Sequence, residues 1–251
     1  MKIGIAGYGF VGKAHELILE EYHDIIVSDP AQGQYGDLRH ADAIIVCVST
    51  PQGSSGGCHM DNVYEVIEDA PNVPILIKST ISIEGWDMLK HVFPNSKLTF
   101  SPEFLRAVHW KTDIRLQDHM YVGGSDTGFW AELFISVLGP ISVSTAEPKE
   151  LIAAKQLRNS FLALKVTYFN QVKDFCEAQG IDFESVRKVI TDDKRINASH
   201  SQVSRNARGY GGHCLPKDVL ATITSAVGAG GSISILEEAH NYNHQFRKDQ
   251  T

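Results

Sequence analysis

The sequence predicts an α/β fold, in which a doubly wound, mostly parallel sheet is followed by a helical domain with one long central helix. Short runs of β-branched residues alternate with segments of helical periodicity through residue 144. These runs are continuously apolar, which is typical of strands that are buried on both faces. Beyond residue 147 only helical patterns remain. We therefore predict a sheet domain at residues 1–147 and a helical domain at residues 148–251.

Strands and helices are expected to alternate along the first domain, as in a parallel sheet with crossover helices. The expected strands are residues 2–7, 24–28, 43–49, 74–80, 97–101, 120–123 and 141–144. The expected helices are residues 11–21, 62–69, 84–92 and 127–138. The N-terminal apolar run is interrupted by glycines and has no small-residue cleavage site, so we interpret it as a buried strand rather than a signal peptide.

A single helix is expected from Pro148 to Gly180, because proline suits a first helical turn and glycine can end a helix. At 1.5 Å per residue it would be about 45–50 Å long, long enough to bridge domains or subunits. Shorter helices are expected at residues 183–191, 216–227 and 232–248, and residues 193–215 should form a loop.

Composition excludes several functional classes. The chain has 251 residues, a net charge of −7 and no apolar run near the ~18–20 residues of a membrane span, so neither nucleic acid nor a membrane is an expected partner. Its four cysteines are Cys47, Cys58, Cys176 and Cys214. Four cysteines in a chain of this length do not form a disulfide framework, which favours a reducing, cytoplasmic location.

A glycine-rich turn, GYGFVG, follows the first expected strand and opens a helix, and Asp29 ends the second strand. In this context the first glycine makes the turn, the second admits a pyrophosphate and the third lets the helix pack on the strand. The turn thus predicts a Rossmann-type dinucleotide site, with NAD favoured over NADP because Asp29 would bind a ribose diol and repel a 2′-phosphate. The expected cofactor contacts in the turn are Gly7, Tyr8, Gly9, Phe10, Val11 and Gly12.

The stretch ARGYGGHCLPKD, residues 207–218, places Cys214 just before a helix that Pro216 can open, with Lys217 nearby. A helix N-terminus and a cation both favour a thiolate. Beside an NAD site such a thiolate can add to an aldehyde, so that a second oxidation gives a thioester. A zinc site that joins His213-Cys214 to Cys58-His59 is not expected, because neither pair has a CxxC or HxxxH spacing.

The same loop is basic in an otherwise acidic chain, with no acidic residue between Asp193 and Asp218. Such a cluster can attract an anionic ligand or can be a solvated basic face, and charge alone leaves both interpretations open. Its members are Lys194, Arg195, Arg205, Arg208 and Lys217.

With these features the sequence resembles the UDP-glucose/GDP-mannose 6-dehydrogenase family over almost its whole length. GYGGHCLPKD is similar to that family's cysteine motif GFGGxCLPKD. Further segments match in the family's order: Val48–Pro51 (VSTP), Lys78–Thr80 (KST), Ser101–Leu105 (SPEFL), Lys155 and Asn159 with Phe161–Ala163, Lys165 and Asn170 on the central helix, and Arg195-Ile196.

The resemblance implies a four-electron oxidation of the C6 alcohol of a UDP- or GDP-sugar to the uronic acid by two NAD. Cys214 would be the nucleophile, Lys155 and Asn159 would hold the oxyanion and water, and Glu103 would be the acid/base. Asp218 would activate water or fix Lys155, and Thr80 would orient water or a substrate oxygen. The resemblance further implies cofactor contacts at Ser49, Thr50, Pro51, Ser79 and Lys217, substrate contacts at Phe104, Leu105, Arg195, Tyr210 and Gly211, and no metal.

Three departures from the family pattern are visible. Only 13 residues separate Asp29 from Ala43, and the family's F-L-x-E-G is here FLRAV, residues 104–108. The chain also stops where the family's linking helix ends, so a compact member without the third domain is expected. Two alternatives stay open: a two-electron β-hydroxyacid-type dehydrogenase, which pairs Lys and Asn on a helix but needs no cysteine, and an inactive NAD-binding assembly subunit.

A homodimer or larger assembly is expected along helix 148–180. Apolar residues recur there at three- and four-residue steps and would form a stripe on one face. The stripe consists of Leu151, Leu157, Phe161, Leu164, Tyr168, Val172 and Phe175. In the family the long central helix likewise packs against its twin in the dimer.

Overall fold

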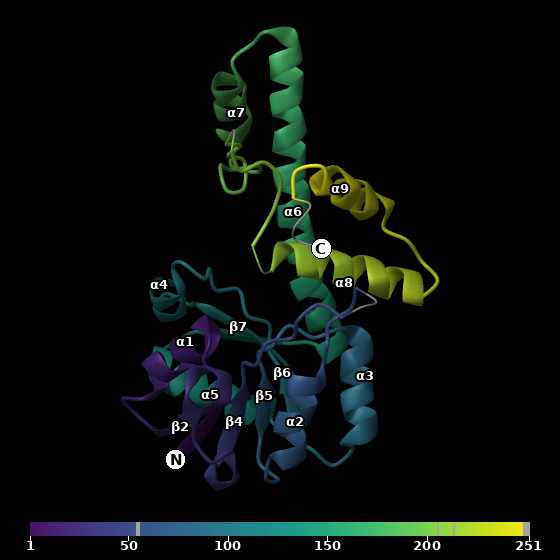
Figure 1. Ribbon diagram of the computed structural model, residues 1–251. Coiled ribbons are helices and arrows are strands. Elements are labelled where there is room, and N and C mark those ends of the chain that lie inside the picture. Colours follow the sequence, from purple (N-terminus) through teal and green to yellow (C-terminus); the bar gives the residue numbers. More distant parts are fainter. Residues whose placement is uncertain (54–55, 205, 213, 248–251) are drawn as a thin grey trace. The chain divides into compact units, whose positions relative to one another are not determined.

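The computed structural model describes residues 1–53, 56–204, 206–212 and 214–247 (Figure 1). Arg205, His213 and Lys248, which figure in the sequence predictions, lie outside these residues. The chain divides into two compact units. The first comprises residues 1–53 and 58–155, and the second comprises residues 54–57 and 156–251.

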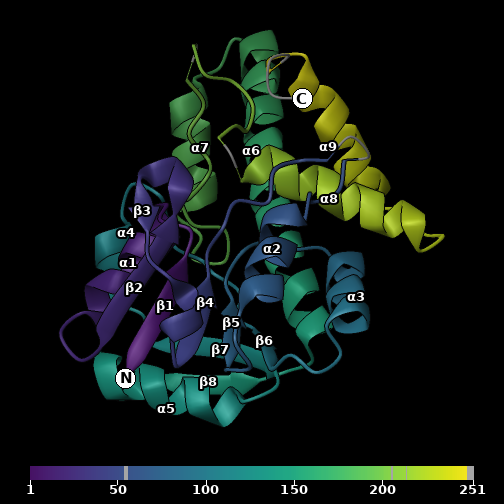
Figure 2. The same ribbon diagram turned by 60° about the horizontal axis from the view of Figure 1, so that its bottom comes forward.

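The first unit is built on a sheet whose strands, within the described residues, follow the order β3-β2-β1-β4-β5-β6-β7-β8 (Figure 2). Neighbouring strands are parallel except in the pairs β2–β3 and β6–β7. The strands are β1 (Lys2–Ala6), β2 (Asp24–Asp29), β3 (Gln34–Tyr35), β4 (Ala43–Val46), β5 (Ile75–Ile77), β6 (Leu98–Phe100), β7 (His119–Gly124) and β8 (Ser142–Thr145).

Helices bury both faces of this sheet, as the continuously apolar strands predict. Along β4, Ala43 and Ile45 belong to one core cluster and Ile44 and Val46 to the other, because successive side chains of a strand point to opposite faces. The first cluster includes residues of α1 (Phe10–Leu19), α4 (Trp110–Arg115) and α5 (Thr127–Leu138). The second includes residues of α2 (Asp61–Asp69) and α3 (Ile83–Val92). The predicted doubly wound, Rossmann-type fold is thus confirmed.

The structure differs from the sequence prediction mainly at strand ends. β4 and β5 end at Val46 and Ile77, earlier than expected, and the backbone N–H groups of Lys78 and Ser79 both donate to the carbonyl of Val46. Helix α4 was not expected because its six residues are too few to show a period. The 3₁₀ turns η1 (Pro30–Gln32) and η2 (Leu38–His40), with β3 between them, fill the short segment after Asp29.

The second unit is helical. α6 (Pro148–Gln179) begins in the first unit and continues into the second, and it ends where Gly180 adopts a left-handed φ of 67°. The long helix is therefore confirmed almost to the residue. It is followed by α7 (Phe183–Thr191), α8 (Leu215–Gly228) and α9 (Ser234–His244). Among the described residues, no helix is both long and apolar enough for a membrane span.

Candidate active site

The glycine-rich turn connects β1 to α1, and two of its glycines are required by the turn itself. Gly7 has a φ of 89°, and a Cβ on it would lie 2.6 Å from the backbone of Cys47. A Cβ on Gly12 would lie 2.1 Å from the carbonyl oxygen of Gly7. These two positions therefore exclude side chains for reasons internal to the fold.

Gly9 is different, because a Cβ on it would have no atom within 4 Å. Gly9 is the N-cap residue of α1, has an ordinary φ of −70° and is exposed. No acidic side chain occupies the first turn of α1, where Phe10 and Val11 are half-buried. This glycine thus leaves open space at a helix N-terminus, which is the local arrangement that binds a phosphate group.

Asp29 ends β2 beside this turn, and its Oδ2 accepts a hydrogen bond of 2.7 Å from the backbone N–H of Tyr8. The Tyr8 hydroxyl donates to the Glu16 carboxylate, and this hydrogen bond is the main reason that the pKa of Tyr8 is raised to about 12. The strand end, the turn and the first helix are therefore tied together, with the Asp29 carboxylate fixed next to Gly7.

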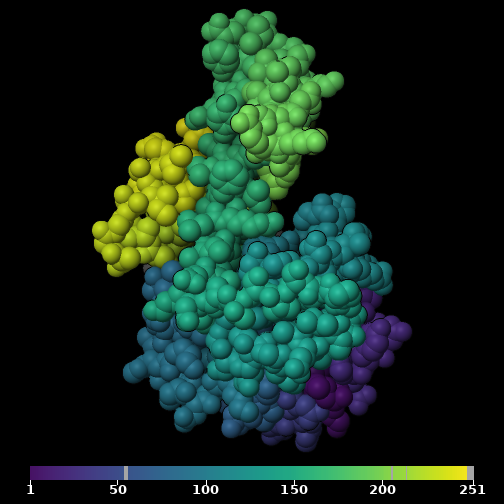
Figure 3. All heavy atoms as spheres, turned by 180° about the vertical axis from the view of Figure 1, so that it is seen from behind, coloured from purple at the N-terminus to yellow at the C-terminus, as the bar shows by residue number. Residues whose placement is uncertain are grey.

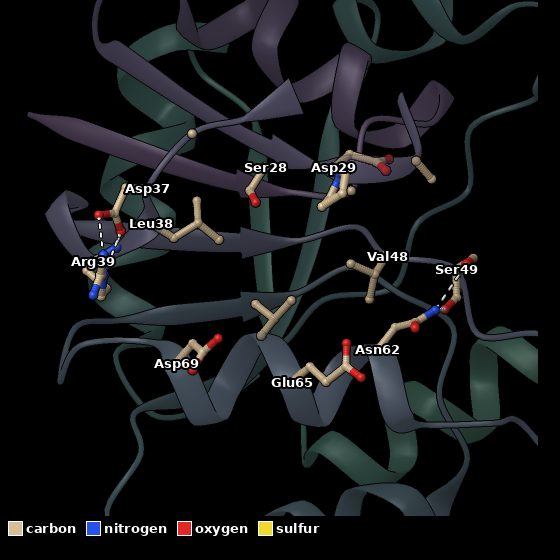
Figure 4. A pocket seen from close by; sticks show the side chains of 15 residues that line it. Ser28, Asp29, Asp37, Leu38, Arg39, Val48, Ser49, Asn62, Glu65 and Asp69 are labelled. Carbon is tan, nitrogen blue, oxygen red and sulfur yellow. Dashed lines mark hydrogen bonds and ion pairs between the residues drawn. The ribbon is translucent and has the colours of Figure 1, made fainter. Parts of the chain in front are cut away.

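A cavity of about 650 Å³ opens beside Asp29 in the first unit (Figure 4). Of the predicted cofactor contacts, Gly7, Asp29 and Ser49 line it. Three further carboxylates line it as well: Asp37, Glu65 and Asp69. Among the described lining residues Arg39 is the one cation, and its Nη2 lies 2.8 Å from Asp37, so the cavity is acidic overall.

The segments after β4 and β5 hold each other in place. The Thr50 hydroxyl donates to the carbonyl of Thr80 (2.6 Å), and the Ser79 hydroxyl donates to the carbonyl of Val48 (2.8 Å). Thr50 and Ser79 are buried, whereas Pro51 is exposed. The predicted cofactor contacts Thr50 and Ser79 therefore shape the neighbouring backbone, and within the described residues they do not line the cavity.

Glu103 is buried and belongs to a cluster that the sequence analysis did not assemble. Its Oε2 lies 3.1 Å from Lys78 Nζ and 4.0 Å from His15 Nε2. Its Oε1 accepts hydrogen bonds from the backbone N–H groups of Phe104 (2.7 Å) and Leu105 (3.1 Å). Lys78 also donates to the Ser101 hydroxyl at 3.1 Å. Lys78, quoted only as part of a motif, is thus the counter-ion of the predicted acid/base.

The protonation states of Glu103 and His15 follow from their burial and from the charge of Lys78. Burial alone raises the pKa of Glu103, but the charge of Lys78, together with hydrogen bonds from Lys78 and Phe104, outweighs it and leaves the pKa below its usual value. Burial, and then the charge of Lys78, lowers the pKa of His15 to about 4. Near neutral pH we therefore expect an ionised Glu103 beside a neutral His15.

Lys155 lies at the last position of the first unit, and its Nζ donates to the carbonyl oxygen of Glu103. The same ammonium lies 5.4 Å from the centre of the Phe104 ring. Next to this segment, Arg106 binds Asp113 of α4 with contacts of 2.6–2.9 Å. The departure from the family's F-L-x-E-G pattern is thus accompanied by an ion pair that fixes the loop to α4.

In the second unit Cys214 is exposed and is the N-cap residue of α8, as predicted. Asp218, one turn further along, is buried, and its Oδ2 accepts a hydrogen bond of 2.6 Å from Asn159 Nδ2 on α6. Its Oδ1 lies 3.4 Å from Lys217 Nζ. The structure therefore brings Asn159, Lys217 and Asp218 together beside the first turn of the helix that Cys214 caps.

Two arginines of the basic loop form ion pairs with acidic residues of the second unit. Arg195 forms an ion pair with Asp193, at 2.5 Å, and its side chain remains 88% exposed. Arg208 forms an ion pair with Asp174 of α6, at 2.7 Å. Arg208 is thus engaged inside the unit, whereas Arg195, a predicted substrate contact, stays accessible.

Tyr210 and Gly211, both predicted substrate contacts, differ in exposure. Tyr210 is only 2% exposed and packs with Ala163 and Val219, and burial raises its pKa to about 12. Gly211 is half-buried. Within the described residues, no group of three or more His, Cys, Asp or Glu side chains is arranged to hold a metal ion.

Comparison with known proteins gives a consistent result. Residues 150–245 match the family model described as the central domain of the UDP-glucose/GDP-mannose dehydrogenase family. The UDP-glucose 6-dehydrogenase YwqF of Bacillus subtilis (strain 168) is 28% identical over 222 residues, covering 82% of this chain and 49% of that protein. The chain spans about half the length of the first curated relatives it matches.

Solved structures of other dehydrogenases have a fold similar to that of this chain. A UDP-glucose dehydrogenase from the hyperthermophilic archaeon Pyrobaculum islandicum has a TM-score of 0.84 at 20% identity, over 98% of this chain and 68% of that chain. A 3-hydroxyisobutyrate dehydrogenase from Mycobacterium tuberculosis has a TM-score of 0.73 at 17% identity, over 99% and 94% of the two chains. These identities establish a shared fold only. By sequence, residues 150–245 are similar to the central domain of the UDP-glucose/GDP-mannose dehydrogenase family, and most of the chain is similar to curated UDP-glucose 6-dehydrogenases.

Proposed function

We propose that the chain is an NAD-dependent nucleotide-sugar 6-dehydrogenase, which oxidises the C6 alcohol of a UDP- or GDP-sugar to the uronic acid. The observation that carries the proposal is the exposed Cys214 thiol at the N-terminus of α8, with the buried Asn159–Asp218 pair at the first turn of the same helix. The match to the family's central domain and the names of the relatives support it.

The cofactor proposal rests on the first unit. The open space at Gly9, the N-terminus of α1 and the Asp29 carboxylate fit the pyrophosphate and ribose of a dinucleotide. Bound there, nicotinamide adenine dinucleotide would accept a hydride in each of two oxidations. The acidic cavity beside Asp29 favours NAD, because a 2′-phosphate would meet carboxylates and an Arg39 already paired with Asp37.

The proposed reaction balances as two two-electron oxidations and one hydrolysis. The alcohol first loses a hydride and a proton to become an aldehyde. The Cys214 sulfur then adds to the aldehyde carbon and gives a thiohemiacetal, and loss of a second hydride from its carbon and of the proton from its hydroxyl gives a thioester. Water opens the thioester, which releases the carboxylate and returns the thiol. Only the second half of this sequence needs the cysteine.

The other residues act as donors and bases in this scheme. One N–H of the Asn159 amide is used by Asp218, so its second N–H can donate to an oxyanion, as can the Lys155 ammonium. Glu103 suits a base better than an acid because Lys78 keeps it ionised. Thr80 would orient water or a substrate oxygen, and Lys217 would contact the cofactor.

The substrate contacts proposed are Phe104, Leu105, Arg195, Tyr210 and Gly211. A homodimer and a cytoplasmic location also belong to the proposal, since a reactive thiol such as Cys214 persists in a reducing compartment.

The test is Cys214→Ser, assayed with a panel of UDP- and GDP-sugars and with either NAD or NADP. We expect uronate formation to fall about a hundredfold or more, because a hydroxyl is a far weaker nucleophile than a thiolate, while NAD affinity stays within about twofold. Cys58→Ser is the matched control in the first unit. Uronate production near the parent rate would show that Cys214 is not the nucleophile, and equal or tighter NADP binding would refute the cofactor preference.

The β-hydroxyacid alternative is tested by adding a β-hydroxyacid to the substrates of the same assay. Such an enzyme would reduce one NAD for each β-hydroxyacid molecule and would not depend on Cys214, because it stops at the carbonyl. NADH formation from a β-hydroxyacid that survives Cys214→Ser would therefore replace the proposal.

A further inference from the structure

The loop that leads to Cys214 is held by two side-chain amides from different helices. Asn170 of α6 accepts hydrogen bonds at its Oδ1 from the Gly209 N–H (3.2 Å) and from Arg208 Nε (3.2 Å). Asn243 of α9 contacts the next residue, Tyr210. Both asparagines are buried, at 1% and 5% exposure. All of these residues belong to the second unit.

Asn243 pairs with both backbone groups of Tyr210. Its Oδ1 accepts from the Tyr210 N–H at 2.7 Å, and its Nδ2 donates to the Tyr210 carbonyl at 3.0 Å. The amide thus takes the place that a neighbouring strand would take in a sheet. An amide carries both a donor and an acceptor, whereas an ionised carboxylate lacks the donor and alanine lacks both.

Gly209 lies so close to the Asn243 amide that a side chain there would collide with it. Its φ is 75°, and a Cβ on it would lie 2.3 Å from Asn243 Oδ1. Gly212 also has a positive φ, of 82°, but a Cβ there would have no atom within 4 Å. The requirement for glycine at position 209 is therefore partly a requirement for close approach by Asn243.

A second layer of contacts surrounds this pairing. Arg208, already paired with Asp174, donates to the Tyr242 hydroxyl at 3.1 Å, and that hydroxyl donates to Asp174 at 2.6 Å. Arg247 Nε donates to the Arg208 carbonyl at 2.8 Å. Residues 242–247, at the end of α9 and directly after it, thus fix the start of the loop, while its far end is fixed where the Asp218 N–H of α8 donates to the carbonyl of the N-cap residue Cys214.

We propose that Asn243 is a positioning residue for the Cys214 thiol. It anchors Tyr210, four residues before the cysteine, and the two glycines in between have little conformational restraint of their own. The place of the thiol at the α8 N-terminus therefore depends on this anchor. The inference rests on the proposed role of Cys214 as nucleophile, and it assigns to α9 a part in the reaction that does not involve contact with substrate.

The test compares Asn243→Ala with Asn241→Ala, an exposed asparagine on the same helix. With the full chain and an aldehyde-level nucleotide sugar, we expect kcat for the second oxidation to fall about tenfold to a hundredfold in Asn243→Ala, because small misplacement of a reacting group has effects of that size. The KM for NAD and the rate of alcohol oxidation should stay within about twofold. Equal loss in both oxidations would mean a merely structural role and would overturn the proposal.

A readout without turnover separates this inference from the proposed function. Iodoacetamide labelling of Cys214, followed by peptide mass spectrometry, should slow about fivefold in Asn243→Ala and stay unchanged in Asn241→Ala, because a displaced thiol loses the favourable field of the helix N-terminus. Unchanged or faster labelling would refute the positioning role even in an active enzyme. Slower labelling in a chain that oxidises no nucleotide sugar would support the positioning and refute the function.

Asn243→Ala leaves two buried backbone groups unpaired and could fail to fold. Gly209→Ala then serves as a second variant, since it disturbs the same pairing from the loop side and retains the amide. It should produce the same selective loss in the second oxidation and the same slower labelling. A folded Gly209→Ala variant that behaves like the parent in both assays would overturn the inference.

Discussion

At the scale of single residues, the buried charges of the first unit depend on one another. Glu103 is ionised because Lys78 Nζ lies 3.1 Å away and two backbone N–H groups donate to it. Removing one partner of a buried ion pair is costly, about 3–5 kcal/mol, since the other charge is left uncompensated. His15 completes the cluster as a neutral ring, whose Nδ1 lies 2.9 Å from the Val11 carbonyl in the first turn of α1.

His15 should make the stability of the first unit depend on pH. Burial, and then Lys78, lowers its pKa from 6.5 to about 4. Between these values the unfolded chain binds a proton that the folded chain does not, so stability falls as pH falls from about 6.5 to about 4. The full effect is on the order of 3 kcal/mol. His15→Leu should remove this part of the pH dependence, in denaturant titrations at pH 7 and pH 4.

Tryptophan fluorescence suits this measurement, because Trp86, Trp110 and Trp130 all lie in the first unit. His91→Leu, at an exposed position of α3, is the control and should keep the pH dependence of the parent. Identical losses of stability on acidification in the parent and in His15→Leu would contradict the assignment of a neutral, buried His15.

At the scale of elements, the β1–α1 turn contains one glycine that the fold requires, Gly12, and one that leaves space for a ligand, Gly9. Gly12→Ala should destabilise the first unit by about 3 kcal/mol or prevent folding, because its Cβ would overlap the Gly7 carbonyl. Gly9→Ala should cost under about 1 kcal/mol, since its Cβ meets nothing. Yet it should weaken NAD binding about tenfold or more, because the methyl group would stand where a pyrophosphate approaches the turn.

Calorimetric titration with NAD measures the affinity, and denaturant unfolding of the same samples measures the stability, of the Gly9→Ala and Gly12→Ala variants. Gly128→Ala in the first turn of α5, where a Cβ also meets no atom within 4 Å, is the matched control and should change neither quantity. Normal NAD affinity in a folded Gly9→Ala variant would mean that the turn does not hold the dinucleotide.

The elements that could be predicted from sequence are those whose signal is local and repeated. The helix from Pro148 ends at Gly180 as expected because its period continues for 32 residues and its end is marked by a glycine. Helix α4, with six residues, and β3, with two, are too short to show a period. The early ends of β4 and β5 depend on hydrogen bonds between segments distant in sequence, which no local pattern contains.

The candidate site was predictable to a similar extent. Cys214, Asn159 and Asp218 were predicted from short motifs, and the structure places Asn159 on α6 and Cys214 and Asp218 at the start of α8. His15 and Asn243 were missed, because each acts through a partner 88 or 33 residues away, and a lone histidine or asparagine within a helix has no distinctive spacing. Their roles follow only from burial and from the atoms they contact.

At the scale of the whole molecule, α6 presents apolar side chains to solvent within the second unit. Leu157, Phe161, Tyr168 and Phe175 are 47%, 64%, 55% and 60% exposed. Figure 3 shows atoms of α6, in green, at the surface beside those of α9, in yellow. Two predicted members of the stripe do not contribute, since Leu151 is buried in the first unit and Val172 packs against the Phe169 cluster.

An apolar cavity of about 640 Å³ lies along the same part of α6. Phe161 and Tyr168 line it together with Ile196 and Ile235, and Ile235 is 64% exposed. An apolar surface of this extent is uncommon on a soluble monomer and is typical of an interface. The family resemblance and the exposed stripe thus agree in favouring a second copy of the chain as the occupant.

We therefore expect a homodimer along α6, and Phe161→Glu should dissociate it. Light scattering at micromolar concentration should give twice the mass of one chain for the parent and the mass of one chain for the variant, because two desolvated carboxylates would face an apolar surface. Val189→Glu on α7 is the control: Val189 is 77% exposed and lies outside the stripe, so the same substitution should leave the dimer intact. A parent that is monomeric and active at these concentrations would refute the dimer, and the exposed stripe would then need a different partner.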